Sequence, residues 1–177
     1  MKKIVIKYGF ISGLILVAMV YTMMAMMGDS NDFEKGEVIG YLFMIGGFSM
    51  IFLGIREYRD RISGGAITFT MGFRVGILIT LVASLCYVAG WMSYFHFIDG
   101  TFIEKYSSYY IGKINTSGKS PAEIEKEITA FNTNMENYKN PFVMALYTFG
   151  EVFPMGLVIT ILCAFLMRRK INADTVT

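Results

Sequence analysis

The chain has 177 residues, of which 54% are hydrophobic and 17% are charged, and its formal net charge is +2. Soluble domains carry about 25% charged residues, so this composition excludes an ordinary soluble enzyme, a disordered chain and a small secreted disulfide scaffold. The small net charge gives no indication of nucleic-acid binding. We therefore expect an all-α polytopic membrane protein with a single membrane domain over residues 1–177.

Four apolar runs are long enough to cross a bilayer, which takes about 20 residues of helix. They predict transmembrane helices at 8–27, 38–55, 75–97 and 142–167. A cleaved signal peptide is the alternative for the first run. Because the apolar core of a signal peptide has about 7–15 residues, a first transmembrane helix is the simpler interpretation.

Glycines recur on single faces of the first three predicted spans. Residues seven apart lie on one face of a helix, because seven residues make about two turns. Helices associate in membranes through close packing of such small residues. We expect packing seams inside the bundle, or alternatively a homodimer seam, at Gly9, Gly13, Gly40, Gly47, Gly54, Gly76 and Gly90.

Basic residues lie mainly on one side of the predicted membrane. Lys and Arg favour the short cytoplasmic loops of membrane proteins, and every arginine falls in the link between the second and third spans or in the C-terminal tail. The N-terminal lysines are on the same side. We therefore expect cytoplasmic N- and C-termini, with lipid headgroups anchored by Arg56, Arg59, Arg61, Arg74, Arg168 and Arg169.

Two segments outside the predicted spans have patterns of their own. Residues 62–73 interleave apolar and hydroxyl side chains, which predicts a short interfacial helix or a re-entrant segment leading into the third span. Residues 99–141 carry two apolar stripes of helical spacing, the first largely aromatic. Between the stripes, Ser120, Pro121 and Glu123 form the pattern of a helix start with a capping box. We expect an extracytoplasmic helical hairpin here, acting as a structural cap, a ligand-binding lid or a docking surface.

Ionisable residues inside transmembrane helices are costly, so each is a candidate functional residue. Glu151 lies about ten residues into the fourth span, and Pro154 beside it predicts a kink because it removes a backbone hydrogen bond. Glu37 and His96 lie at the same end of the second and third spans. The hypothesis is an outward-facing vestibule where Glu151, Glu37 and His96 meet and bind a cation or a proton. A structural carboxyl group satisfied by hydroxyls is the alternative.

Four motifs occur together along the chain: GEVIGY at 36–41, GIREYRD at 54–60, ITF at 67–69 and FGEVFPMGL at 149–157. With these motifs the chain resembles the bacterial domain-of-unknown-function 4199 family over nearly its whole length. The resemblance implies a four-helix protein of the bacterial inner (cytoplasmic) membrane. It implies no activity, cofactor or catalytic residue.

Three functions remain open at this point. The small size, the glycine seams and the aromatic outer segment favour a structural or accessory protein that binds a partner in the lipid bilayer, either another membrane protein or a second copy of the chain. A small ion- or proton-coupled transporter that uses Glu151 beside the Pro154 kink is the first alternative. A lipid-binding or lipid-modifying protein is the second. The sequence has no catalytic constellation, phosphate loop or metal-ligand spacing, so we expect no enzymatic activity, no cofactor and no metal.

Overall fold

The computed structural model describes residues 1–27, 33–98 and 100–169. These residues form six α-helices and no strand, and four of the helices are long and apolar enough to cross a membrane. The prediction of an all-α membrane protein with four spans is therefore confirmed. The helices are α1 (Lys2–Met27), α2 (Phe33–Arg61), α3 (Phe69–Phe97), α4 (Phe102–Asn115), α5 (Pro121–Tyr138) and α6 (Pro141–Met167).

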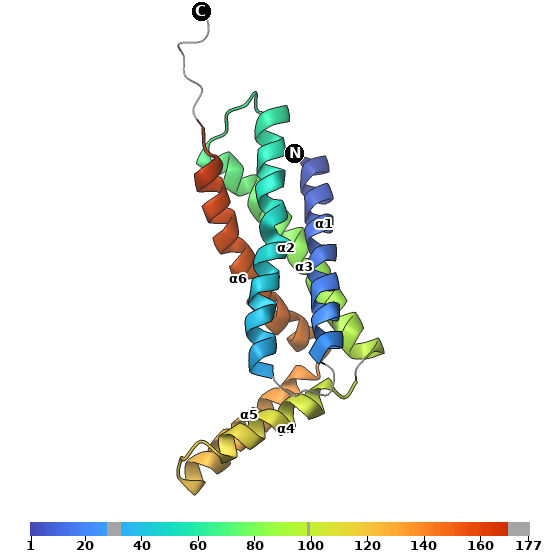
Figure 1. Ribbon diagram of the computed structural model, residues 1–177, viewed down its shortest axis with the longest axis vertical. Coiled ribbons are helices and arrows are strands. Elements are labelled where there is room, and N and C mark those ends of the chain that lie inside the picture. The colour runs from blue at the N-terminus through green and yellow to red at the C-terminus, as the bar shows by residue number, and fades with distance from the viewer. Residues whose placement is uncertain (28–32, 99, 170–177) are drawn as a thin grey trace, which may run out of the picture.

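The four spanning helices, α1, α2, α3 and α6, form a bundle, and α4 and α5 lie at one end of it (Figure 1). Helix α1 begins and α6 finishes at the opposite end. We call these two ends the α4–α5 end and the terminal end. Two helices thus occupy the predicted segment 99–141, and its extracytoplasmic location stays a prediction.

The segment at 62–73 is not a separate helix, so the expectation of a short interfacial helix was wrong, and the alternative of a re-entrant segment leading into the third span stays a prediction. Gly64 and Gly65 have φ angles of +67° and +85°, and this turn between α2 and α3 needs a backbone conformation that glycine adopts without strain. Thr68 then caps α3, its side chain accepting a hydrogen bond from a backbone N–H of the first turn. The apolar residues after Thr68 consequently belong to α3, which begins at Phe69 instead of near residue 75.

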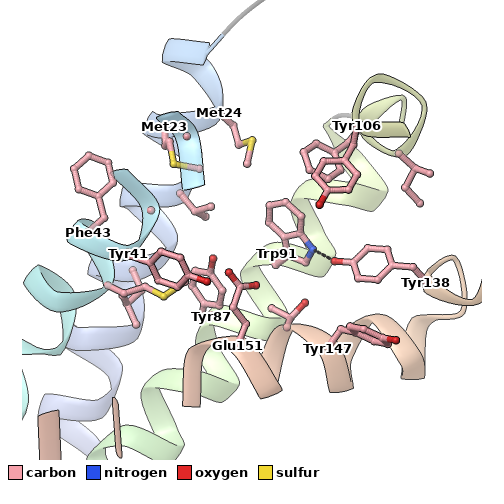
Figure 2. Close-up of a pocket in the computed structure, with 18 of the residues that line it drawn as sticks. Met23, Met24, Tyr41, Phe43, Tyr87, Trp91, Tyr106, Tyr138, Tyr147 and Glu151 are labelled. Carbon is pink, nitrogen blue, oxygen red and sulfur yellow. Dashed lines mark hydrogen bonds between the residues drawn. The ribbon is translucent and has the colours of Figure 1, made fainter. Parts of the chain in front are cut away.

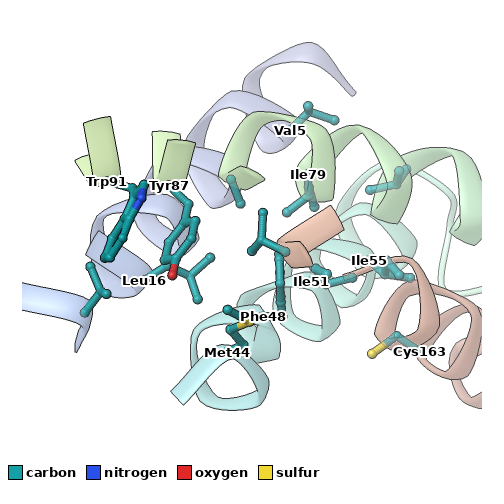
Figure 3. Packing of buried hydrophobic residues seen from close by; sticks show 14 of the residues in the cluster. Val5, Leu16, Met44, Phe48, Ile51, Ile55, Ile79, Tyr87, Trp91 and Cys163 are labelled. Carbon is teal, nitrogen blue, oxygen red and sulfur yellow. The ribbon is translucent and has the colours of Figure 1, made fainter. Parts of the chain in front are cut away.

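The core of the bundle lies between its four spanning helices, α1, α2, α3 and α6. Phe48, Ile51 and Ile55 of α2 are fully buried and belong to one apolar cluster with Ile79 of α3 and Leu16 of α1 (Figure 3). Lipid tails are as apolar as these side chains, so burial alone gives little reason for the helices to associate. Close packing and hydrogen bonds must hold the bundle together.

Glycines provide that close packing. Of the seven that the sequence indicated, six lie so near a neighbouring helix that an added methyl group would overlap with it: Gly9 with Val82, Gly13 with Cys86, Gly47 with Leu16, Gly54 with Ile79, Gly76 with Thr160 and Gly90 with Val17. Gly40 differs, because a Cβ there would meet Met23 Sδ at 3.7 Å, an ordinary contact. The space beside Gly40 belongs to the cavity described below.

Hydroxyl groups add directional bonds between the same helices. The hydroxyls of Thr80 in α3 and Thr160 in α6 share a hydrogen bond of 2.8 Å, and Thr80 also donates to the carbonyl of Gly156 at 3.3 Å. Ser12 of α1 donates to the carbonyl of Gly47 in α2 at 2.8 Å. Polar contacts of this kind fix the register of helices in an apolar surrounding.

Helix α5 begins as the sequence indicated. The hydroxyl and the backbone N–H of Ser120 both donate to the carboxylate of Glu123, at 2.6 and 3.0 Å. These hydrogen bonds favour the charged carboxylate and lower the pKa of Glu123 below its ordinary value. The start of α5 is thereby defined within the α4–α5 segment.

Candidate functional site

A cavity of about 520 Å³ lies between the bundle and the α4–α5 pair, and residues of all six helices line it. Small-molecule sites in proteins usually measure about 300–1,000 Å³ and have mostly apolar walls with a few polar groups. The described wall fits that pattern, since aromatic rings, methionines and aliphatic side chains make up most of it (Figure 2).

The spacing of residues on the helices explains how this wall forms. Tyr87 and Trp91 are four residues apart, so they share one face of α3, and both are buried. Thr148 and Glu151 are three residues apart on α6 and face the same cavity. On α2, Gly40 leaves space where a larger side chain would project.

Aromatic contacts attach the α4–α5 pair to α3. Trp91 Nε1 donates a 2.8 Å hydrogen bond to the hydroxyl of Tyr138 in α5 (Figure 2). The ring of Phe102 in α4 meets the Trp91 ring edge-on, with 5.2 Å between centroids. Tyr106 of α4 stacks on Phe131 of α5 at 6.2 Å, which packs the two helices on each other. Burial raises the pKa of the Tyr138 hydroxyl above its ordinary value.

Glu151 lines the cavity a little more than a third of the way along α6. It is ten residues from Pro141, which corresponds to about 15 Å of helix. Its side chain is exposed, lies close enough to Tyr87 and Tyr138 to interact with both electrostatically, and points into the cavity in Figure 2. A carboxyl group at such depth is expected to face a cavity or the bundle interior rather than lipid.

The other residues of the predicted vestibule do not all join Glu151. His96 is exposed at the end of α3, its ring lies edge-on to that of Phe97 at 4.7 Å, and it is not part of the cavity wall that Glu151 lines. Pro154 is exposed and lies outside the cavity wall; α6 continues through it and changes direction near its middle (Figure 1). Glu37 lies in α2, and its side chain is outside the described part of the chain.

The arginines proposed as headgroup anchors all lie at the terminal end, far along the bundle from the cavity. Those at the end of α2 form ion pairs, for example Arg59 with Asp60 at 2.7 Å and Arg61 with Glu57 at 3.7 Å. Contact with lipid headgroups stays a prediction for the whole set, which is Arg56, Arg59, Arg61, Arg74, Arg168 and Arg169.

Sequence reasoning missed two features of the site and its surroundings. It singled out neither Tyr87 nor Trp91 as a cavity residue, although their four-residue spacing on α3 was a usable signal. It also missed that Lys7 and Tyr8 of α1 both donate to the Glu57 carboxylate of α2, at 2.9 and 2.6 Å. No local pattern relates these helices, because the pairs are 50 and 49 residues apart.

Among the described residues, no group of three or more His, Cys, Asp or Glu side chains is placed to hold a metal ion. The cavity therefore offers one carboxylate, hydroxyls and aromatic rings from its described wall. Such an arrangement can bind and orient a molecule, and we assign no reaction to it.

Comparisons with known proteins place the chain in a family. A family model described as "Protein of unknown function (DUF4199)" matches residues 7–169, which include all four spans except the first few residues of α1. No curated protein and no solved structure matches the chain. The chain is a multi-pass membrane protein that belongs to the DUF4199 family.

Proposed function

We propose that this protein binds an amphiphilic molecule in the cavity between the bundle and the α4–α5 pair, and that it is an accessory protein of its membrane. The observation that supports the proposal is the cavity itself, about 520 Å³ in volume, with a largely apolar and aromatic wall. The wall also carries the Glu151 carboxylate and hydroxyl groups, among them those of Tyr87 and Thr148. An apolar body with one polar head is the kind of molecule that matches this wall.

The proposal includes an orientation. With both termini in the cytoplasm of a bacterial inner membrane, as the basic residues at the terminal end favour, the α4–α5 pair lies on the extracytoplasmic side. The cavity then opens at the level of the outer leaflet and reaches about 15 Å into the span. Its occupant would come from that leaflet or from the solution outside it. No catalytic group is part of the proposal, because binding alone accounts for the wall.

The other two functions have less support. Partner binding remains a proposal for the outward faces of the bundle, but their exposed apolar side chains, such as Leu42 and Leu162, are also what lipid contact requires. Ion-coupled transport has one observation in its favour, since Glu151 lines a cavity from within its span, with Pro154 three residues away. Proton flux in liposomes that is lost in Glu151→Gln would favour transport over binding alone.

Trp91 provides the test of ligand binding, because it is the single tryptophan of the chain and lies in the cavity wall. The purified protein in lipid nanodiscs is titrated with a brominated alkyl alcohol, whose bromine quenches indole fluorescence on contact. Gly40→Leu fills the cavity from α2, where the nearest atom to an added Cβ is 3.7 Å away. Gly46→Leu is the matched control on the same helix, because Gly46 also has room for a Cβ but does not line the cavity.

We expect saturable quenching in the wild type and in Gly46→Leu, and only the weak, non-saturable quenching caused by the bilayer in Gly40→Leu. The physical reason is that the added side chain occupies the space the alcohol needs. Equal, non-saturable quenching in all three proteins would contradict the proposal.

A further inference from the structure

The exposure of the lining residues shows where the cavity opens. Of those described on the four spanning helices, Tyr41 of α2 and Tyr147 and Glu151 of α6 are exposed, and the others are buried or half-buried. The lining residues of α1 and α3 thus form the closed side of the cavity, where Figure 2 shows Tyr87 and Trp91 on α3. The cavity opens between α2 and α6, and we call this place the α2–α6 opening.

The α2–α6 opening lies within the span of α6 and not at its end. Tyr147 and Glu151 are six and ten residues from Pro141, which corresponds to about 9 and 15 Å of helix. Both belong to the helix Pro141–Met167, which is apolar and long enough to cross a membrane. At such positions a spanning helix is surrounded by the acyl chains of lipids rather than by water.

The rim of the opening is apolar. Leu42 follows Tyr41 on α2 and is 61% exposed, and Leu146 precedes Tyr147 on α6 and is 56% exposed. Exposed apolar side chains on spanning helices are the surface that lipid tails contact. The lipid-facing surface of the bundle therefore continues past this rim into the cavity.

The course of α6 explains why the opening forms here. A Cβ at Gly156 would lie 2.8 Å from the ring of Phe48 in α2, so the two helices pack closely at this level. Pro154 lies between Gly156 and Glu151, and α6 changes direction near its middle (Figure 1). Proline bends a helix because it removes a backbone hydrogen bond and clashes with the preceding turn. Close packing against α2 thus gives way to the opening on the α4–α5 side of the bend.

The interior of the cavity suits a flexible apolar chain. Leu16 and Val20 of α1 and Met44 of α2 line it, and each is at most 7% exposed. Met23 and Met24 of α1 line it as well. Methionine side chains are flexible and polarizable, so they adapt to apolar ligands of varied shape. An acyl chain has no polar group that would need a hydrogen-bond partner in such surroundings.

We propose that the ligand of this cavity is a membrane lipid, one acyl chain of which enters sideways through the α2–α6 opening while its headgroup stays at the membrane surface. This inference rests on the proposed function and gives it a ligand class and a route of entry. A soluble amphiphile is the competing ligand, and it would enter past Asn134 of α5, which is exposed and also lines the cavity.

Photoreactive lipids test the inference in the wild-type protein in nanodiscs. Two phosphatidylcholines are compared, one with a diazirine at the end of an acyl chain and one with a diazirine on the headgroup. Tyr87 and Trp91 are 7% and 8% exposed and lie on the closed side of the cavity, so lipid around the bundle does not reach them. We expect the chain-end probe to label these two residues and the headgroup probe to leave them unlabelled. Labelling of both residues by the headgroup probe would overturn the proposal.

An octanol that carries a diazirine, added from solution, separates this inference from the proposed function. If octanol labels Tyr87 and Trp91 while the chain-end lipid labels only outward residues such as Leu42 and Leu162, the lipid ligand is overturned and the proposed function stands. If neither probe labels the two residues, both fail.

Variants then locate the route of entry. Gly40→Leu fills the cavity and should lose the labelling of Tyr87 and Trp91 by the chain-end probe, whereas Gly46→Leu, outside the wall, should keep it. A third lipid, with its diazirine in the middle of the chain, should label Tyr41 or Tyr147 in a way that Gly40→Leu also removes.

The residues labelled by the mid-chain probe decide between sides of the bundle. If the labelling that Gly40→Leu removes falls instead on Met19 and Met23, which line the cavity on α1, entry between α2 and α6 is contradicted. If Gly40→Leu does not fold, the contrast between the chain-end and headgroup probes in the wild type still decides whether an acyl chain is the ligand.

Discussion

Trp91 joins the bundle to both helices of the α4–α5 pair. Its indole N–H donates to Tyr138, its ring meets Phe102, and it is buried. A buried N–H that loses its acceptor costs about 1–3 kcal/mol. Losing this 2.8 Å hydrogen bond is therefore costly, because it leaves the indole N–H as an unpaired donor beside a largely apolar cavity.

Tyr138→Phe tests this role directly. Removing the hydroxyl should weaken the attachment of α5 by about 1–3 kcal/mol, because the Trp91 N–H is left without its acceptor. Hydrogen–deuterium exchange of the α5 amides should become faster by a corresponding factor. Tyr147→Phe, a neighbouring cavity tyrosine whose ring lies 6.1 Å from that of Tyr138, should leave α5 exchange unchanged. The same exchange rates in both variants would show that the hydrogen bond does not hold α5.

At the scale of helices, glycines decide how closely the spans approach. A Cβ at Gly9 of α1 would lie 2.6 Å from the Cβ of Val82 in α3, and both atoms are fixed to their backbones. A Cβ at Gly46 would meet only the flexible end of Met19, at 3.6 Å. Identical substitutions at these two positions should therefore have opposite consequences.

Gly9→Ala should lower the free energy of unfolding by about 1–3 kcal/mol, because α1 and α3 must move apart to admit the methyl group. Gly46→Ala should leave it unchanged or raise it by up to about 1 kcal/mol, since alanine favours the helix. Reversible unfolding in mixed micelles measures both values. The interpretation of close packing fails if Gly9→Ala proves as stable as Gly46→Ala.

The whole molecule shows what can be inferred from sequence and what cannot. The four spans were predictable because each is a continuous apolar run, and the start of α5 because Ser120 and Glu123 form a local capping pattern. The boundary at Phe69 was missed because Thr68 caps a helix whose first turns look like a separate amphipathic segment. Glu151 was identified as a candidate because a charge within a span is conspicuous.

The cavity itself was not predictable. It depends on how the α4–α5 pair docks on α3, which is set by contacts such as Trp91 with Tyr138, 47 residues apart. Packing between distant residues also decides which polar side chains reach the cavity. His96 and Glu151 both lie toward the α4–α5 end, but of the two only Glu151 lines the cavity. Depth along a span can be read from residue numbers, whereas the direction a side chain faces depends on the packing of all six helices.

The most direct test of a ligand in this cavity is mass spectrometry of the intact protein, released from its membrane in mild detergent, with wild type, Gly40→Leu and Gly46→Leu compared at equal concentration. We predict one retained amphiphile per chain in the wild type and in Gly46→Leu, and none in Gly40→Leu. The reason is that, of these proteins, only Gly40→Leu has a side chain that fills the space beside Met23. A wild type that retains no amphiphile, or the same retained mass in all three proteins, would contradict a ligand site between the bundle and the α4–α5 pair.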